Sequence, residues 1–542
     1  MGEIKKFKRV LVANRGEIAI RVFRACRELG IRTVAIYSEE DKNSLFRTKA
    51  DEAYQIGKGK TPVGAYLSID EIIALAKAKG VDAIHPGYGF LAENEEFAKT
   101  CADAGIEFIG PTAEMMNSLG DKIQSKIVAH SVGVPTVPGV EKAIETEAEA
   151  LEFANSCGYP VMLKAAAGGG GRGMRIVRSE EELLPQFRSA RSEAAKAFGI
   201  DDIFIEKYLE NPKHIEVQIL GDKEGNIVHL YERDCSIQRR HQKVIEFTPA
   251  LCLTDEQRSA ICEDAIKIAK AVSYRSAGTV EFLLDHTTGK HYFIEMNPRI
   301  QVEHTVTEMV TGIDIVQAQI LIAEGHRLDS REIGIKGQDD IKVTGHAIQC
   351  RITTEDPAND FMPDTGTIES YRSPGGFGIR LDGGNGFQGS TITPFYDSLL
   401  LKVTSFGRDF DDTRRKAIRA LGETIIKGVK TNIPFMLNVL NHPTFAAGEC
   451  DTGFIANTPD LLDIGKVQDT ELRVIEFLGN KFVNETKGRK RSYNVPVFPK
   501  FKSEEIADLQ GRGTKQLFDE MGAKDFTQWV RKQQRLFVTD TT

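Results

Sequence analysis

Residues 295–304 read EMNPRIQVEH and bring an unusual number of reactive and ligand-binding groups into ten positions. Alternate side chains of an extended strand share a face, so Glu295, Asn297 and Arg299 are expected to point to the same side. The first two offer oxygen ligands for a hard cation, and the arginine offers a planar fork for an oxyanion. Glu303 follows within reach as a further carboxylate. This segment therefore predicts a site for a divalent cation beside an anion.

A second acidic strand is expected directly before this segment. Glu281 lies in an apolar run, and residues Asp285–Lys290 between it and Glu295 are typical of a hairpin loop. Such a hairpin sets the two carboxylates about 5 Å apart, where they repel each other unless a cation bridges them. Solvated strand carboxylates are the simpler alternative. With Asn297 nearby, we favour Mg²⁺ or Mn²⁺ bound by Glu281, Glu295 and Asn297.

A glycine-rich loop, AAGGGGRG at residues 166–173, separates two short strand-like runs. It lacks the Gly-Lys-Ser/Thr ending and the following helix of a P-loop. Glycines nevertheless let backbone N–H groups approach a phosphate and let the loop move. A hairpin tip without a ligand is the alternative. Because Lys164 precedes the loop and Arg172 lies within it, phosphate binding is the better interpretation.

A basic cluster, RRHQK at residues 239–243, follows the mixed-charge residues 232–234. Basic runs are usually solvated turns, and His214 and His241 are individually more typical of structural histidines. The tight interleaving of opposite charges favours a pocket for a polyanion.

The order of expected elements indicates a multidomain protein with α/β and α+β parts. Residues 8–115 alternate strand-like and helix-like segments, which predicts a parallel sheet. No G-x-G-x-x-G follows the first strand, which weakens a dehydrogenase interpretation. Residues 136–205 predict a small α+β unit, 345–404 are rich in β formers, and 414–427 predict a helix.

Composition excludes several classes of protein. The chain has 542 residues, 41% of them hydrophobic, and a net charge of −8, which argues against nucleic acid as the main partner. Its eight cysteines form no C-x-x-C pair, so reduced thiols in the cytoplasm are expected. No apolar run approaches the roughly 18 residues of a membrane span, so we expect no membrane partner.

Together these motifs resemble the biotin carboxylases, an ATP-grasp family, over about residues 8–455. The matching strings lie at residues 13–19, 85–91, 164–175, 206–210, 232–243, 295–304 and 396–398. The resemblance implies an N-terminal parallel α/β domain, an ATP-grasp domain with a mobile lid at 136–205, and a mainly β C-terminal domain. We place these domains at 1–121, 122–335 and 336–455, with a linker and the start of a carboxyltransferase-side region at 456–542.

Two details are similar to the pyruvate carboxylases within this family. Thr305 stands where acyl-CoA carboxylases usually have proline, and residues 513–542 look like the entry to a carboxyltransferase barrel. The biotin-accepting Met-Lys-Met string is absent, so biotin is expected on a carrier domain outside this chain. We expect a piece of a longer polypeptide whose partners are the carrier and carboxyltransferase domains. The family also implies a homodimer through this domain, and a tetramer at full length, with dimer positions at Arg24, Glu28, Phe377 and Arg380.

The resemblance also implies the roles of individual residues. Bicarbonate would be phosphorylated by ATP to carboxyphosphate, with Glu303 as general base, and its CO₂ would pass to biotin. Arg351 would stabilise the biotin enolate and Tyr88 would line the biotin side, although an ordinary strand arginine and a core tyrosine are the alternatives. Bicarbonate would contact Lys243, Arg299, Gln301 and the backbone of Val302. ATP would contact Lys122, Lys164, Gly170, Gly171, Glu206, Lys207, Tyr208, Leu209, His214 and His241.

Three other functions are compatible with parts of this pattern. The chain would otherwise be the biotin carboxylase component of an acyl-CoA carboxylase, another ATP-grasp ligase of the carbamoyl-phosphate type, or a nucleotide-binding scaffold. A scaffold would be expected to lack Glu303, Arg299 or a metal carboxylate, and all of these are present. ATP turnover that needs bicarbonate and rises with biotin separates the first prediction from an ATP-grasp ligase with another acceptor.

Overall fold

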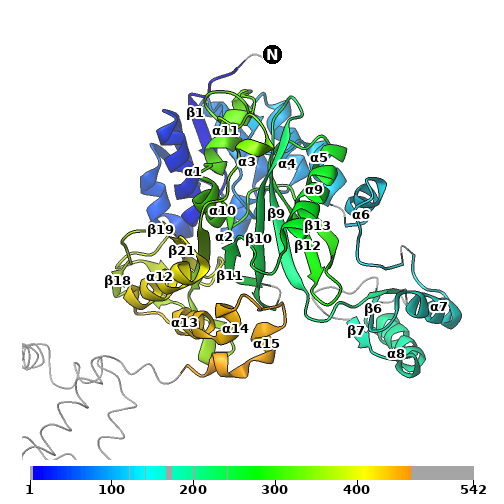
Figure 1. The fold of residues 1–542 in the computed structure, drawn as a ribbon. Coiled ribbons are helices and arrows are strands. Elements are labelled where there is room, and N and C mark those ends of the chain that lie inside the picture. Colours follow the sequence, from blue (N-terminus) through cyan, green and yellow to red (C-terminus); the bar gives the residue numbers. More distant parts are fainter. Residues whose placement is uncertain are drawn as a thin grey trace, which may run out of the picture. The chain divides into compact units, whose positions relative to one another are not determined.

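The computed structural model describes residues 4–120, 122–140, 142–165, 174–198, 202–240 and 242–464. The chain divides into two compact units, Met1–Val467 and Gln468–Thr542, and the second lies outside the described residues. The expected carboxyltransferase-side region after residue 456 therefore falls almost wholly outside the description. The described residues of the first unit are drawn in colour in Figure 1.

The N-terminal region is built on a five-stranded parallel sheet, as predicted. The order β3-β2-β1-β4-β5 places the first strand at the centre, where Val10, Leu11 and Val12 are fully buried. Burial on both faces explains why this strand is continuously apolar. The strands are β1 (Arg9–Val12), β2 (Arg32–Tyr37), β3 (Glu52–Gln55), β4 (Ala83–His85) and β5 (Glu107–Phe108). The helices are α1 (Gly16–Glu28), α2 (Pro62–Tyr66), α3 (Ile69–Ala78), α4 (Glu95–Asp103) and α5 (Ala113–Gly120).

An eight-stranded antiparallel sheet forms the centre of the described unit. Its order is β13-β12-β9-β10-β11-β14-β21-β19, so one sheet runs through both the ATP-grasp domain and the C-terminal domain expected from the sequence. The junction is the pairing of β11 with β14. The strands are β9 (Lys213–Gly221), β10 (Ile227–Arg239), β11 (Gln242–Thr248), β12 (Ser276–Asp285), β13 (Lys290–Asn297), β14 (His346–Thr353), β19 (Ile379–Gly383) and β21 (Leu399–Gly407).

Helices cover this sheet and bury its apolar side. Helix α9 packs against β9 and β10, and α12 packs against β21 and β14 (Figure 1). On β9, Ile215, Val217 and Ile219 join a core cluster with residues of α9. The helices of this region are α9 (Asp255–Ala271), α10 (His304–Thr311), α11 (Ile315–Glu324), α12 (Phe410–Glu423), α13 (Ile433–Asn441), α14 (Pro443–Ala446) and α15 (Phe454–Asn457).

The predicted α+β unit at 136–205 is a three-stranded antiparallel sheet in the order β7-β6-β8 with its own hydrophobic core. The predicted strands Val161–Ala165 (β6) and Met174–Val177 (β7) pair as a hairpin. The glycine-rich loop between them lies outside the described residues. The other elements of the unit are α7 (Glu147–Cys157), α8 (Glu180–Phe198) and β8 (Ile203–Lys207). Helix α6 (Lys122–Ser131) precedes the unit and packs against α5, α9 and β13.

The expected helix at 414–427 is shifted. Helix α12 begins at Phe410, because Asp409 caps it by accepting a hydrogen bond from the Asp412 amide, and it ends at Glu423. Residues Ile425–Lys427 form β22, which pairs with β18 (Ser370–Arg372). Short strands complete the C-terminal region: β15 (Glu355–Asp356), β16 (Met362–Pro363), β17 (Gly366–Thr367) and β20 (Thr391–Ile392).

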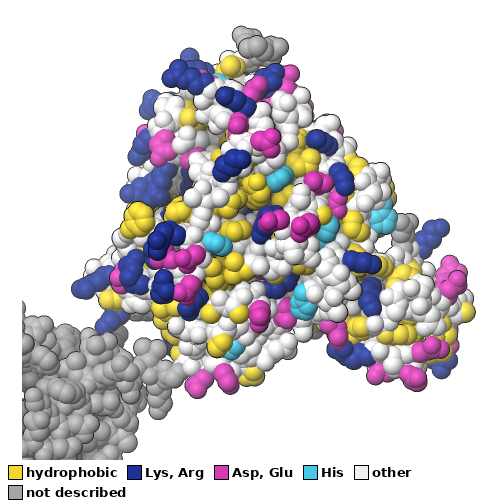
Figure 2. All heavy atoms as spheres, viewed as in Figure 1, with side chains coloured by type: hydrophobic (Ala, Val, Ile, Leu, Met, Phe, Trp, Pro, Cys, Tyr) yellow, Lys and Arg dark blue, Asp and Glu magenta, His cyan; other side chains and the backbone are white. Residues whose placement is uncertain are grey.

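Charge is mixed on the surface, and membrane-spanning character is weak. The face drawn in Figure 2 intersperses basic and acidic side chains. Within the described residues, no individual helix has the length and apolar composition of a membrane span. Only α10 and α11 taken together pass that test, with a 91° bend between them, and most residues of both helices are buried in the fold.

Candidate active site

One face of the large sheet carries buried polar side chains, and these side chains make up the candidate site. Along β9, His214, Glu216 and Gln218 alternate with the apolar side chains that face α9, and all three are buried. Burying charge is costly unless partners compensate it. Arg233 on β10 is one such partner: its Nε donates to Glu216 Oε1 at 2.5 Å, and Nη1 donates to Gln218 Oε1 at 2.8 Å.

Lys243 on β11 is the cation that holds the buried carboxylates together. Its Nζ lies 2.5 Å from Glu216 Oε2, 2.9 Å from Glu281 Oε1 and 2.8 Å from Glu303 Oε1. Burial alone would lower the pKa of this ammonium, but the three carboxylates raise it well above its ordinary value. Lys243 therefore stays charged and joins residues that lie far apart in the sequence.

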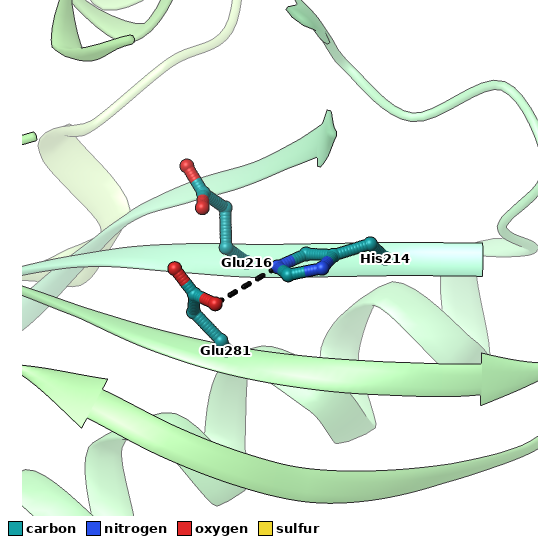
Figure 3. Close-up of side chains that lie close together, drawn as sticks. All are labelled: His214, Glu216 and Glu281. Carbon is teal, nitrogen blue, oxygen red and sulfur yellow. Dashed lines mark ion pairs between the residues drawn. The ribbon is translucent and has the colours of Figure 1, made fainter. Parts of the chain in front are cut away.

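Glu281 is the most highly bonded carboxylate of the group. Asn297 Nδ2 and Gln301 Nε2 donate to its Oε1 at 3.0 and 2.9 Å, and His214 Nε2 lies 3.0 Å from its Oε2 (Figure 3). Burial raises the pKa of this carboxyl, but Lys243 and His214 lower it more, so the net pKa lies well below the usual range. The group is thus an anion at neutral pH.

The predicted hairpin is confirmed. Glu281 and Glu295 are direct partners in the pairing of β12 with β13, which continues to Asp285 opposite Lys290. The loop closes with Gly289 at a φ of 69°, a conformation that favours glycine. Asn297 points toward Glu281, as its hydrogen bond shows.

The ligand atoms nearest to Glu281 include groups that were not expected. His214, Glu216 and Glu281 offer a nitrogen and carboxylate oxygens that lie within 4.8 Å of one another (Figure 3). One further observation fits a bound polar ligand or cation here. The buried Gln301 Oε1 has no hydrogen-bond donor among the described residues, although its Nε2 is fixed on Glu281.

Glu303 lies directly before α10 and faces two cations. Its Oε1 accepts from Lys243 and its Oε2 accepts from Arg351 Nη2 at 2.9 Å. Burial would raise the pKa of this carboxyl, but Lys243, Arg351 and Arg233 depress it far below its ordinary value. The start of a helix also favours a negative charge. Glu303 is therefore ionised over the whole neutral range.

Arg299 approaches the same cluster from the end of β13. Its Nη2 donates to Asn297 Oδ1 at 3.0 Å, and its Nε lies 2.9 Å from Glu93 Oε2. The guanidinium is thus held by Asn297, a predicted metal ligand, and by the half-exposed Glu93 of the N-terminal region.

Tyr88 and Val302 are tied to the cluster through a buried ion pair. The Tyr88 hydroxyl donates to Glu17, and Lys402 Nζ lies 3.0 Å from Glu17 Oε1. Lys402 Nζ also donates to the Val302 carbonyl at 3.0 Å, which holds the backbone next to Glu303. Tyr88 therefore lies against the polar cluster, although it also packs against the core around α1.

Most of the residues expected to contact ATP lie in or next to the 136–205 unit, and three of them lie outside the described residues. In the 136–205 unit, Lys164 forms an ion pair with Glu206, while Lys207 Nζ donates to the carbonyls of Gly158 and Tyr159. The Lys207 side chain is therefore used within that unit. Tyr208 donates its backbone N–H to Pro160 and is partly buried, Leu209 is buried, and Lys122 begins α6. Gly170, Gly171 and His241 lie outside the described residues.

Three residues of the cluster were missed from the sequence: Glu216, Arg233 and Glu246. Glu246 on β11 accepts from Arg351 Nε at 2.5 Å. The signal for Glu216 was present, because residues 213–221 alternate polar and apolar side chains with a period of two. Glu246 gave no comparable signal, because its partners Gln349 and Arg351 lie on a strand distant in sequence. Arg233 lies within the mixed-charge residues 232–234, but nothing in the sequence indicated its pairing with Glu216 on the preceding strand.

Three of the four expected dimer positions line one groove. Arg24, Glu28 and Arg380 line a hollow of about 330 Å³ together with Arg21 and Glu308. Phe377, the fourth position, is 87% exposed. The four expected dimer positions therefore lie along this groove or at the exposed surface.

Comparison with known families covers nearly the whole described unit. Residues 6–116 match the model of the biotin carboxylase N-terminal domain, and 349–457 match that of the biotin carboxylase C-terminal domain. Residues 121–331 between them match the ATP-binding domain of the carbamoyl-phosphate synthase L chain.

A full-length relative and two solved structures show the same relationship. Pyruvate carboxylase of Bacillus subtilis is 53% identical over 99% of this chain, which spans 47% of that protein, so the chain is about half as long as such relatives. The biotin carboxylase subunit of pyruvate carboxylase is 50% identical, with a TM-score of 0.77 over 84% of this chain and 99% of that one.

The second structure is the biotin carboxylase domain dimer of 2-oxoglutarate carboxylase from Hydrogenobacter thermophilus, solved with MgADP, ADP and bicarbonate. It is 51% identical, with a TM-score of 0.76 over 85% of this chain and 99% of that chain. The expected combination of a parallel α/β region with antiparallel sheets is thereby confirmed. With half of its residues identical over complete solved domains, the chain belongs to the biotin carboxylase family.

Proposed function

We propose that this chain carboxylates biotin at the expense of ATP, using bicarbonate and passing through carboxyphosphate. The observation that carries the proposal is the position of Glu303, an ionised buried carboxylate held between Lys243 and Arg351 beside the acidic hairpin. The surrounding cations attract anionic reactants, and an anion bound beside this carboxylate raises its pKa so that it can accept a proton.

The first step would be deprotonation of bicarbonate. Lys243, Arg299 and Gln301 would hold this anion together with the Val302 backbone, and Arg299 suits a planar carboxylate-like group. Glu303 in the free protein is a weak base, because its cations depress its pKa. A second negative charge bound beside Glu303 raises that pKa, so proton transfer becomes favourable only when bicarbonate is in place.

ATP and metal binding are assigned to the acidic hairpin and the 136–205 unit. Glu281, Glu295 and Asn297 would hold Mg²⁺ or Mn²⁺, and the unpaired Gln301 Oε1 beside them suits a further polar contact. When bound, the metal would neutralise charge on the phosphoryl group. The predicted ATP contacts are Lys122, Lys164, Gly170, Gly171, Glu206, Lys207, Tyr208, Leu209, His214 and His241; among these, the Lys207 side chain is already engaged with Gly158 and Tyr159.

The second step would transfer CO₂ to biotin. Arg351 is held by Glu246 and Glu303, and it would stabilise the negative charge that develops on the ureido oxygen of biotin. Phosphate released from carboxyphosphate would take the biotin proton. Tyr88, held on Glu17 near this arginine, would line the biotin side.

The larger context is also part of the proposal. Biotin would arrive on a carrier domain, and a carboxyltransferase domain would pass the carboxyl group to pyruvate, giving oxaloacetate, as the names of the relatives suggest. The groove and Phe377 would form a homodimer contact, and the full-length protein would be a tetramer. All eight cysteines are free thiols, which supports the prediction of a reducing cytoplasm.

The proposal is tested by ADP release from the purified chain with ATP, Mg²⁺, bicarbonate and free biotin. We expect turnover that requires bicarbonate and rises with biotin. Glu303→Gln and Arg299→Ala should each lower the biotin-dependent rate on the order of a hundredfold, the scale of general-base and oxyanion contacts. The exposed Arg327→Ala is the matched control and should retain activity. Near-normal rates in folded Glu303→Gln protein would contradict the assignment.

A further inference from the structure

Thr305 is buried two residues after Glu303, and its hydroxyl makes a specific pair of contacts. Thr305 Oγ1 donates to Gln349 Oε1 at 2.5 Å and lies 2.8 Å from Thr404 Oγ1. A hydroxyl has one hydrogen, which here is directed to Gln349, so the Thr404 hydroxyl must donate to Thr305. The threonine thus fixes which end of the Gln349 amide faces it.

From Gln349 the contacts continue to the arginine assigned to biotin. Gln349 Nε2 donates to Glu246 Oε2 at 2.8 Å, and Glu246 Oε1 accepts from Arg351 Nε at 2.5 Å. Arg351 Nη2 in turn donates to Glu303 Oε2 at 2.9 Å. Because Glu303 and Thr305 lie on one turn of chain, these contacts close a ring of hydrogen bonds.

The orientation of the Gln349 amide depends on Thr305, whereas Arg351 donates to Glu246 and Glu303 whichever way that amide lies. With a donor at its Oε1, Gln349 must present its NH₂ group to Glu246. Without that donor the buried Gln349 Oε1 loses this partner, and the amide is held at its other end by the bond to Glu246 alone. Gln349 and Glu246 are both fully buried, so water does not easily replace the lost bond.

We propose that Thr305 and Gln349 are positioning residues that orient the Arg351 guanidinium through Glu246. The proposal rests on the function proposed above, in which Arg351 stabilises the biotin enolate. Neither residue touches a reactant in this assignment. Their effect is to hold one face of Arg351 on Glu246, so that the remaining N–H groups keep a fixed direction. Small displacements of such a group are costly in catalysis.

The test compares Thr305→Val, which keeps the shape and loses the hydroxyl, with Thr305→Ser, which keeps the hydroxyl. Both are assayed for biotin-dependent ADP release and for bicarbonate-dependent ATP cleavage without biotin. Thr305→Val should lower the biotin-dependent kcat/KM on the order of ten- to a hundredfold, and more than it lowers ATP cleavage. Thr305→Ser should restore most of the loss. Thr413→Val, which removes another fully buried hydroxyl on α12, should leave both rates near those of the unchanged protein.

Several outcomes would overturn the proposal. Folded Thr305→Val with unchanged biotin-dependent kcat/KM would do so, as would equal losses of both activities or failure of serine to restore function. Should Thr305→Val fold poorly, Gln349→Met, which keeps side-chain length and loses both amide contacts, takes its place with the same expectation. Absence of any biotin response in the unchanged protein would instead reject the function proposed above.

Discussion

At the scale of single residues, the site depends on charges that are buried and paired. Lys243 joins Glu216, Glu281 and Glu303, although these residues come from β9, β12 and the turn before α10. Removing one member leaves its partners buried without compensation, which typically costs about 3–5 kcal/mol. The unfolding free energy of the protein should therefore depend on whether these carboxyls are ionised.

The pH dependence of stability tests this point. The pKa of Glu303 is depressed in the folded protein, while an unfolded glutamate titrates near about 4.3. Its stabilising contribution is therefore present above that pH and is lost as pH falls through the folded value. Glu303→Gln should be less stable than the unchanged protein at pH 7, and this difference in unfolding free energy should shrink below about pH 4. Urea unfolding across this range measures it; a difference independent of pH would contradict the pairing.

Site residues could be predicted from the sequence where their partners lie close by in the chain, and not where the partners lie far away. Glu281 and Asn297 were predicted because one hairpin contains them both, whereas Gln301 was predicted from the resemblance to the biotin carboxylases. Glu246 escaped prediction because its partners, Arg351 and Gln349, lie on β14, about a hundred residues later. Strand pairing over such distances leaves no local pattern in the chain.

At the scale of elements, local signals worked where caps and turns are explicit. The hairpin at β12 and β13 was predicted from Gly289 and the flanking apolar runs, and its register is as expected. The helix expected at 414–427 was misplaced, because its N-cap is Asp409, directly before the observed first residue Phe410 and five residues before the expected start. The last three residues expected in the helix, Ile425–Lys427, instead form β22, which pairs with the sequence-distant β18.

Helix α9 offers a test of an element away from the site. Thr254 Oγ1 accepts from the Gln257 amide at 3.2 Å, and the Gln257 side chain accepts from the Thr254 amide at 3.0 Å, which forms a capping box. Thr254→Ala should lower the unfolding free energy by about 1 kcal/mol. Thr254→Ser, which keeps the cap, should be near neutral, and both should retain ADP release. Equal urea midpoints for the alanine and serine variants would contradict the role of the cap.

At the scale of the whole molecule, the sequence predicted domains and the structure shows a continuous sheet. The antiparallel sheet extends from β13 to β19 and includes strands from both sides of the expected boundary at 335–336. Composition and motif spacing indicate where domains change but carry no information on which strands share a sheet. The continuity matters for function, because Lys243 on β11 and Arg351 on β14 meet at Glu303 on this shared surface.

Association of two copies is the molecular-scale prediction. Phe377 is 87% exposed, and burying such a ring at a contact would supply much of its hydrophobic stabilisation. Phe377→Asp should therefore shift the chain from dimer to monomer in sedimentation velocity without altering its fold. Phe395→Asp, which changes another exposed phenylalanine outside the expected contact, is the matched control. A Phe377→Asp protein that sediments like the unchanged dimer would exclude this surface.

Oxygen transfer from bicarbonate to phosphate tests the proposed role of Glu303 in preparing bicarbonate to attack ATP. Phosphorylation joins a bicarbonate oxygen to phosphorus, and loss of CO₂ leaves that oxygen on phosphate. With ¹⁸O-labelled bicarbonate, ATP, Mg²⁺ and biotin, we expect phosphate that carries one bicarbonate oxygen, and far less of it with Glu303→Gln. Phosphate whose new oxygen comes from water, released at the same rate without bicarbonate, would rule out this role of Glu303.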